Sequence, residues 1–155
     1  MKDLDDFSKF LTDEELAKVA PMLERLTTLD KRADQQENYM SFVKHVWPQF
    51  IEGSHHKIYA EKLQAVADGK LKRLIINMPP RHTKSEFASY LFPTWLMGRR
   101  PDLKIIQATH TAELAVGFGR KIKNLIESED FKDVFPDVSL AGDAKASGRW
   151  STNKG

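Results

Sequence analysis

Residues 75–85, Ile-Ile-Asn-Met-Pro-Pro-Arg-His-Thr-Lys-Ser, are the stretch of sequence that decides the fold. They continue a short apolar, β-branched run, residues 74–78, which is typical of a strand buried on both faces. A turn with two prolines follows, and residues 84–96 then read as a helix. The apolar residues on one face of that helix are Phe87, Leu91 and Trp95. The stretch therefore predicts a strand, a loop and a helix in succession.

The pattern repeats further along the chain. Residues 103–108 form a second short apolar run, and residues 111–126 carry apolar side chains at helical spacing. Strand, helix, strand and helix in this order predict an α/β fold with a parallel sheet and right-handed crossovers. Because two strands make a poor sheet, we expect the sheet of residues 69–155 to be incomplete.

The region before the first predicted strand has a helical pattern. A capping-box sequence at residues 12–15 predicts a helix over residues 13–29. Apolar residues at helical spacing predict a second helix over residues 39–47 and a third over residues 54–69. We therefore expect a helical N-terminal region over residues 1–68.

The composition is that of a globular, water-soluble protein. The chain has 155 residues, of which 41% are hydrophobic and 30% charged, and its net charge is +2. It has no cysteine, which excludes disulfides and cysteine-based metal sites and fits a reducing compartment. No apolar run approaches the roughly 18 residues that a membrane-spanning helix needs. These features predict a cytoplasmic protein without a membrane partner.

The loop that enters a helix through Lys84 and Ser85 has the layout of a Walker A phosphate loop. In such loops, backbone N–H groups and the positive end of the helix surround the phosphates. The lysine reaches the β- and γ-phosphate oxygens, and the serine hydroxyl binds Mg²⁺. The loop residues predicted to bind nucleotide are Pro79, Pro80, Arg81, His82, Thr83, Lys84 and Ser85.

The loop departs from the standard pattern at two positions. Met78 and Thr83 stand where the pattern has glycine, which permits positive φ and close approach of the backbone. The alternative to nucleotide binding is a plain strand–turn–helix connection with Lys84 and Ser85 at an exposed helix start.

Several segments resemble phage terminase large subunits. Residues 78–85 resemble the variant Walker A motif of these proteins, which commonly reads PPRHGKS. Residues 55–63 resemble their helix ahead of the loop, and residues 107–120 their second strand–helix segment. Arg149, the residues 150–152 and Gly155 resemble the stretch ahead of their Walker B strand. Read this way, residues 69–155 are the first part of an ATPase domain of the P-loop NTPase type.

The resemblance implies roles for individual residues. Lys84 and Arg81 take the catalytic positions, with Lys84 on the β- and γ-phosphates and Arg81 touching the γ-phosphate. Ser85 holds Mg²⁺, and the nucleotide is ATP. His55 and His56 are candidates for binding adenine, together with Phe50. For these three residues the alternative is helix capping or core packing.

The resemblance also implies partners and missing parts. Family members act with double-stranded viral DNA, a portal protein and a small terminase subunit, as a homo-oligomeric ring in the host cytoplasm. ATP hydrolysis needs a Walker B acid and a catalytic glutamate, and no apolar run followed by Asp-Asp or Asp-Glu occurs after Lys84. We therefore expect the chain to stop before Walker B, to lack the nuclease domain, and to show at most weak nucleotide binding with negligible turnover.

Two other readings stay open at this point. The chain could belong to another P-loop NTPase, such as a helicase of related layout. It could instead be a non-enzymatic interaction module that docks on the terminase small subunit or the portal.

Overall fold

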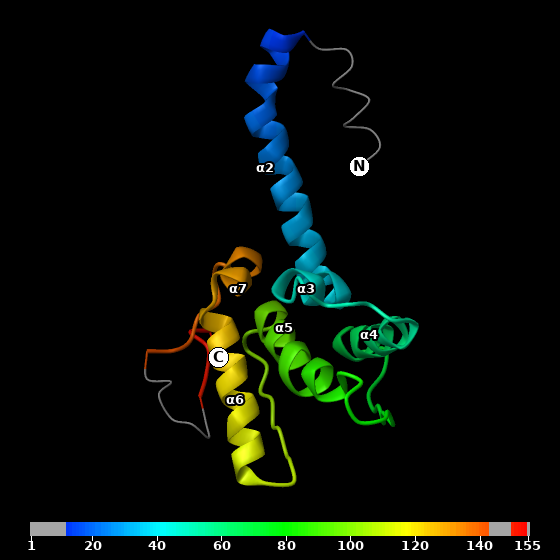
Figure 1. Cartoon of the computed structure of the whole chain (residues 1–155). Helices are drawn as coiled ribbons and strands as arrows, with labels where there is room; N and C mark the ends of the chain where they lie inside the picture. The colour runs from blue at the N-terminus through cyan, green and yellow to red at the C-terminus, as the bar shows by residue number, and fades with distance from the viewer. Residues whose placement is uncertain (1–11, 143–149, 155) are drawn as a thin grey trace. The chain divides into compact units, whose positions relative to one another are not determined.

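The structure, a computed structural model, describes residues 12–142 and 150–154 and is built from helices (Figure 1). The chain divides into two compact units, residues 1–33 and 34–155. Arg149 and Gly155, two of the residues that carry the family resemblance, lie outside the described part. The helices are α2 (Asp13–Glu37), α3 (Tyr39–Val46), α4 (Ser54–Ala67), the π-helix η2 (Glu86–Leu91), α5 (Phe92–Arg99), α6 (Ala112–Glu127) and α7 (Glu129–Val134).

Helix α2 begins with the predicted capping box. The Thr12 backbone N–H donates to Glu15 Oε2 at 2.9 Å, and the Glu15 N–H donates to Thr12 Oγ1 at 3.4 Å. The helix runs on to Glu37, eight residues beyond its predicted end at Leu29. No glycine or proline interrupts residues 30–37, so nothing in their sequence ends the helix. Asn38 then caps α3, because its side chain accepts hydrogen bonds from the first turn of that helix.

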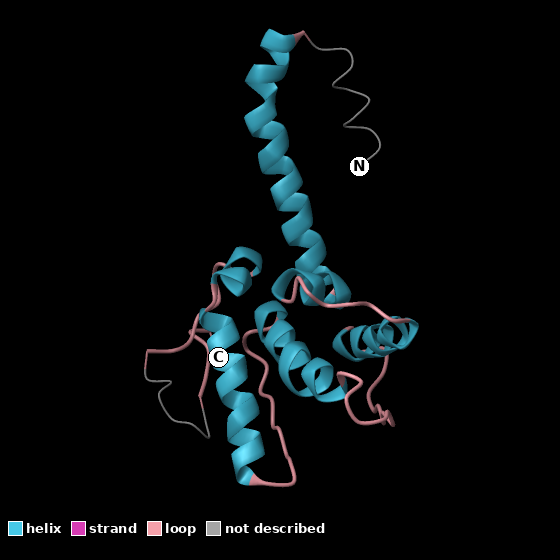
Figure 2. Ribbon diagram, in the orientation of Figure 1, coloured by secondary structure: helices cyan, strands magenta, loops and turns pink. Residues whose placement is uncertain are grey.

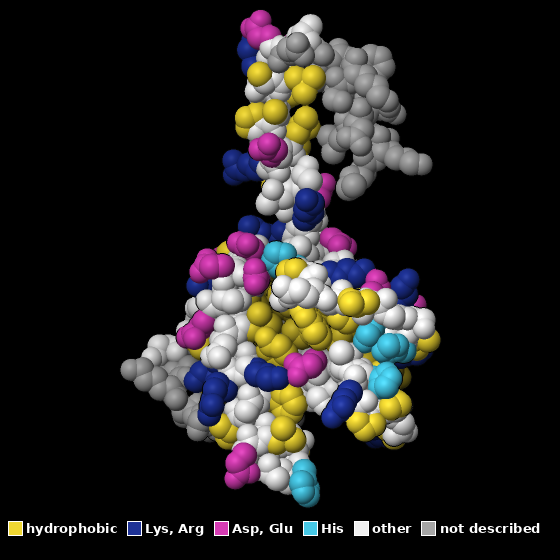
Figure 3. Space-filling view, viewed as in Figure 1, with side chains coloured by type: hydrophobic (Ala, Val, Ile, Leu, Met, Phe, Trp, Pro, Cys, Tyr) yellow, Lys and Arg dark blue, Asp and Glu magenta, His cyan; other side chains and the backbone are white. Residues whose placement is uncertain are grey.

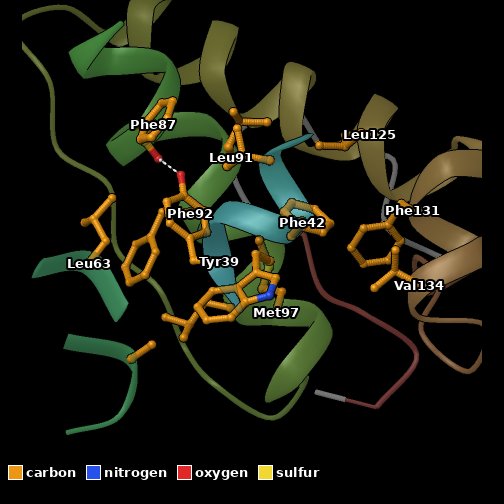
Figure 4. Packing of buried hydrophobic residues seen from close by; sticks show 14 of the residues in the cluster. Tyr39, Phe42, Leu63, Phe87, Leu91, Phe92, Met97, Leu125, Phe131 and Val134 are labelled. Atoms are coloured by element: carbon orange, nitrogen blue, oxygen red, sulfur yellow. Dashed lines mark hydrogen bonds between the residues drawn. The ribbon is translucent and has the colours of Figure 1, made fainter. Parts of the chain in front are cut away.

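The core of residues 34–155 is aromatic. Its fully buried rings come from α3 (Tyr39, Phe42), η2 (Phe87), α5 (Trp95) and α7 (Phe131). Figure 4 shows Tyr39 and Phe42 lying between the residues of the other helices, with the Tyr39 hydroxyl donating to the Phe87 carbonyl at 2.8 Å. Ring pairs at 5–7 Å in edge-to-face or tilted arrangements are favourable beyond the apolar area that they bury. Helices before and after residue 69, where the predicted α/β region begins, therefore share one core.

Three further predicted helices are present at nearly the expected bounds. Helix α4 begins at Ser54 and ends before Gly69, whose φ of 73° is the left-handed conformation that glycine adopts at helix ends. The helix predicted to start at Lys84 is the continuous run of η2 and α5. Helix α6 buries Phe118, Ile122 and Leu125, as its helical pattern indicates. None of the described helices is long and apolar enough to cross a membrane.

The described residues contain no parallel sheet, so the predicted α/β fold of the P-loop NTPase type was wrong. Figure 2 shows residues 74–78 and 103–108 as loops. In residues 12–142 and 150–154 the single β-type pairing is an antiparallel bridge between Leu140 and Thr152. A strand is stable only when a neighbouring strand accepts and donates its backbone hydrogen bonds. Over the described residues, no such bonds join the two apolar runs.

The burial of these runs explains why the sequence was misleading. Leu74, Ile76 and Met78 pack against the helical core, whereas Ile75 is 88% exposed. In the second run Leu103 packs on the core and Ile106 is 95% exposed. The runs are therefore covered on one face, although continuous apolar composition is typical of strands covered on both.

Candidate phosphate-binding loop

The loop at residues 78–85 forms a turn that contains two left-handed residues. Arg81 has φ 64° and Thr83 has φ 59°, and residues other than glycine rarely adopt such values. Thr83 occupies the position at which a Walker A motif has glycine, and it adopts the conformation that glycine favours. The absence of glycine has therefore not prevented the chain from turning here.

Hydrogen bonds within the loop hold the turn together. The Lys84 ammonium donates to the Met78 carbonyl at 3.3 Å, which links the two ends of the loop. The His82 side chain, through Nδ1, bonds the Pro80 carbonyl at 2.9 Å. The Phe87 N–H donates to the Thr83 carbonyl at 3.0 Å, the first bond of the helix that follows. The loop is therefore a closed turn with its lysine folded back across it.

Helix α4 fixes the loop from one side through two side chains one turn apart. The Tyr59 hydroxyl donates to the Lys84 carbonyl at 3.0 Å, and His56 Nε2 lies 2.7 Å from Thr83 Oγ1. Burial raises the pKa of Tyr59 to about 12, so its hydroxyl stays protonated and able to donate even well above neutral pH. The positions of Thr83 and Lys84 thus depend on α4 as well as on the loop itself.

His56 is buried and bonded at both ring nitrogens. The Gly53 N–H donates to Nδ1 at 2.9 Å, so this nitrogen is the acceptor and the proton of the neutral ring lies on Nε2. Burial lowers the pKa of His56, and the neighbouring His55 adds to this effect. In this arrangement His56 caps α4 and has no free nitrogen for the edge of an adenine base.

The other candidates for adenine binding differ in exposure. His55 is exposed, and its ring lies 3.8 Å from the ring of His56 and 5.8 Å from that of His82, measured between centroids. Figure 3 shows histidine side chains gathered on the surface over α4. Phe50 is half-buried and packs against Trp47, His56 and Phe87. The structure therefore brings His55 and His56 to the loop and leaves Phe50 largely in the core.

The exposed loop carries positively charged side chains. Arg81, His82 and Lys84 are exposed, and the described residues offer no ion pair to Arg81 or Lys84. Glu86, the nearest acidic residue along the chain, is bound instead to Lys121 at 2.9 Å. Unpaired cations next to backbone N–H groups at a helix start favour an anion.

Residues of the loop outside this charged group are also accessible. Pro79, Pro80 and Ser85 are exposed. The Ser85 hydroxyl makes no capping hydrogen bond to the helix, so its oxygen can bind a ligand. Over the part of the chain that the structure describes, no group of three His, Cys, Asp or Glu side chains could hold a metal ion.

Two features of the site did not follow from the sequence. No role at the loop was expected for Tyr59, although its spacing of three residues from His56 could have placed both on the face of α4 that meets the loop. The π-helix η2 directly after the loop had no sequence signal. Its carbonyls are bonded by side chains from distant segments: Tyr39 donates to Phe87 O and Gln107 to Ser89 O. Single π-turns inside helices are frequent at functional sites.

A scan against protein-family models, a search of curated proteins and a search of solved structures each found no match to this chain.

Proposed function

We propose that residues 78–85 bind the phosphates of ATP and that the chain is an N-terminal segment of a terminase large subunit. One observation carries the proposal: the loop adopts a left-handed turn at Thr83 with the Lys84 ammonium folded back onto the Met78 carbonyl. A phosphate oxygen would replace that carbonyl as the acceptor for the ammonium. The proposal rests on this local geometry together with the resemblance of residues 78–85 to the PPRHGKS motif.

Each candidate residue has a distinct part in the proposed binding. Lys84 contacts the β- and γ-phosphates. Arg81, exposed and unpaired among the described residues, offers a planar set of donors to the γ-phosphate. The N–H groups of His82, Thr83 and Lys84 supply further donors.

Mg²⁺ fits this site only as a partner of the nucleotide. The Ser85 hydroxyl is a suitable hard oxygen ligand, but the described residues provide no metal-binding cluster around it. Phosphate oxygens and water would therefore supply the remaining ligands. When bound, Mg²⁺ neutralises the charge that accumulates on the phosphates.

The family resemblance extends the proposal to partners. In an intact packaging motor the segment would act with double-stranded viral DNA, the portal protein and the terminase small subunit, within a homo-oligomeric ring in the host cytoplasm.

Binding of Mg·ATP to the whole chain, measured by isothermal titration calorimetry, tests the proposal. We expect Lys84→Ala to weaken binding by about tenfold or more, because it removes a charge-assisted contact. Arg81→Ala should weaken it in the same direction. Lys62→Ala is the matched control, since Lys62 is an exposed lysine of α4 outside the loop. Equal affinity of the wild type, Lys84→Ala and Arg81→Ala would show that the loop is not the phosphate site.

A second candidate function, an interaction module, is favoured by one feature of α2. Met22, Leu26 and Leu29 are 66%, 43% and 48% exposed, and their spacing places them near one face of the helix. Such a face could dock on the small terminase subunit or on the portal. Co-sedimentation with either partner, lost in Leu26→Lys and kept in Lys84→Ala, would support this function independently of nucleotide.

A further inference from the structure

Thr83 is held in a conformation that its own side chain disfavours. Its φ of 59° brings the Cβ atom close to the backbone, and a β-branched residue tolerates this least. Glycine adopts the same conformation without strain. Contacts from elsewhere in the protein must therefore stabilise the turn at this residue.

A directed chain of hydrogen bonds supplies that stabilisation. The Gly53 N–H donates to His56 Nδ1 at 2.9 Å, and His56 Nε2 then donates to Thr83 Oγ1 at 2.7 Å. The Thr83 hydroxyl in turn donates to the His82 carbonyl at 2.7 Å. Each donor in this series of hydrogen bonds has one acceptor. The direction of the series is set by the Gly53 N–H, because a backbone N–H can only donate.

The surroundings of His56 hold its ring in one orientation. The side chain is only 6% exposed. The Phe87 ring stacks on it at 5.4 Å, and the Phe50 ring meets it edge-on at 4.8 Å. A ring packed in this way cannot turn away from Thr83 without opening the aromatic core.

We propose that His56 is a positioning residue for the phosphate loop. By bonding the Thr83 hydroxyl, it holds residues 82–84 in a turn that a glycine at position 83 would adopt without support. His56 does not touch the nucleotide in this arrangement. It affects phosphate binding through Thr83. Because Thr83 needs the hydrogen bond from His56, the conformation of the loop depends on α4. This inference rests on the proposed function only where it concerns ligand affinity.

Tripolyphosphate is the probe that separates this role from adenine binding, because it has no base. We expect His56→Ala, and the milder His56→Gln if alanine unfolds the chain, to weaken binding of Mg·tripolyphosphate and Mg·ATP alike, by about tenfold. A loss confined to ATP would overturn the proposal, because it would mean that the imidazole binds the base.

Substitutions at Thr83 test whether His56 acts through that residue. In a Thr83→Gly background the turn no longer needs support, so His56→Ala should change tripolyphosphate affinity by less than about threefold. Thr83→Val keeps the branched shape and removes the hydroxyl, so it should match His56→Ala, and Thr83→Ser should resemble the wild type. An equal loss from His56→Ala in the threonine and glycine backgrounds would contradict a positioning role.

A measurement without ligand keeps this inference separate from the proposed function. A strong intraresidue NOE between the amide proton and Hα marks positive φ, and we expect it at residue 83 in the wild type and in Thr83→Ser. It should weaken in His56→Gln and Thr83→Val. If these NMR results hold while tripolyphosphate and ATP fail to bind the wild type, the positioning role stands and the phosphate-binding function fails. A signal at residue 83 that survives His56→Gln unchanged would overturn the positioning role.

Discussion

The aromatic core and the phosphate loop are stabilised in different ways. In the core, Tyr39, Phe42 and Phe131 are fully buried. The Phe42 ring packs against Phe131, and the Tyr39 ring packs against Phe87. In the loop, the side chains of Arg81 and Lys84 are exposed. The turn is held by hydrogen bonds from His56 to the Thr83 hydroxyl and from Tyr59 to the Lys84 carbonyl. Apolar burial therefore determines the stability of one region, and a few polar contacts determine the conformation of the other.

This difference separates what substitutions in each region should change. Burial is non-directional and contributes free energy in proportion to area, so core substitutions should lower the free energy of unfolding. A loop whose ligand-facing groups are exposed adds little apolar burial. Its substitutions should alter anion affinity and leave global stability almost unchanged.

The largest expected effect is that of Phe131→Ala. Phe131 is fully buried against Phe42 and Phe135, so we expect a loss of about 3–5 kcal/mol in the free energy of unfolding. Urea denaturation followed by circular dichroism measures it. The control Ile58→Ala, at a residue 61% exposed, should cost less than about 0.5 kcal/mol. Similar costs for the two variants would contradict the assignment of the core.

The next largest effect is expected at Gly98 of α5. An added Cβ there would overlap the ring of Phe135, so Gly98→Ala should destabilise the protein by about 1–3 kcal/mol. The same substitution at Gly117 of α6 meets no atom within 4 Å and should stabilise the helix by up to about 1 kcal/mol. Opposite signs in thermal unfolding would support the packing of α5 on Phe135. A stabilising Gly98→Ala would refute it.

The smallest effect is expected at Ile106, which is 95% exposed in the second apolar run. Ile106→Ala should change the free energy of unfolding by less than about 0.5 kcal/mol. Ile122→Ala in α6, where the residue is 4% exposed, should cost about 2–5 kcal/mol. An equally large cost at Ile106 would indicate that this run is a buried strand after all.

The sequence predicted the helices because their signals are local. The capping box at Thr12, the apolar spacing of α6 and the glycine after α4 each act within a few residues of the element that they define. The prediction ended α2 at Leu29, although no residue between Leu29 and Glu37 signals an end. The sequence did not reveal η2, whose carbonyls are bonded by side chains from distant segments.

The error in the sheet has a different cause. Whether residues 74–78 and 103–108 become strands depends on partners for their backbone, and partners are not encoded in the runs themselves. At the site, the turn and its charged residues followed from residues 78–85. The bonds from His56 and Tyr59 did not, because they join segments that lie 25 residues or more apart in the chain.

The most direct test of the central claim is an NMR titration of the whole chain. Amide signals of the loop are followed as Mg·ATP, Mg·tripolyphosphate and adenosine are added separately. We expect the amides of residues 81–85 to shift with both phosphate-containing ligands and to stay unchanged with adenosine. Shifts confined to other residues, or no shift with either phosphate ligand, would contradict phosphate binding by this loop.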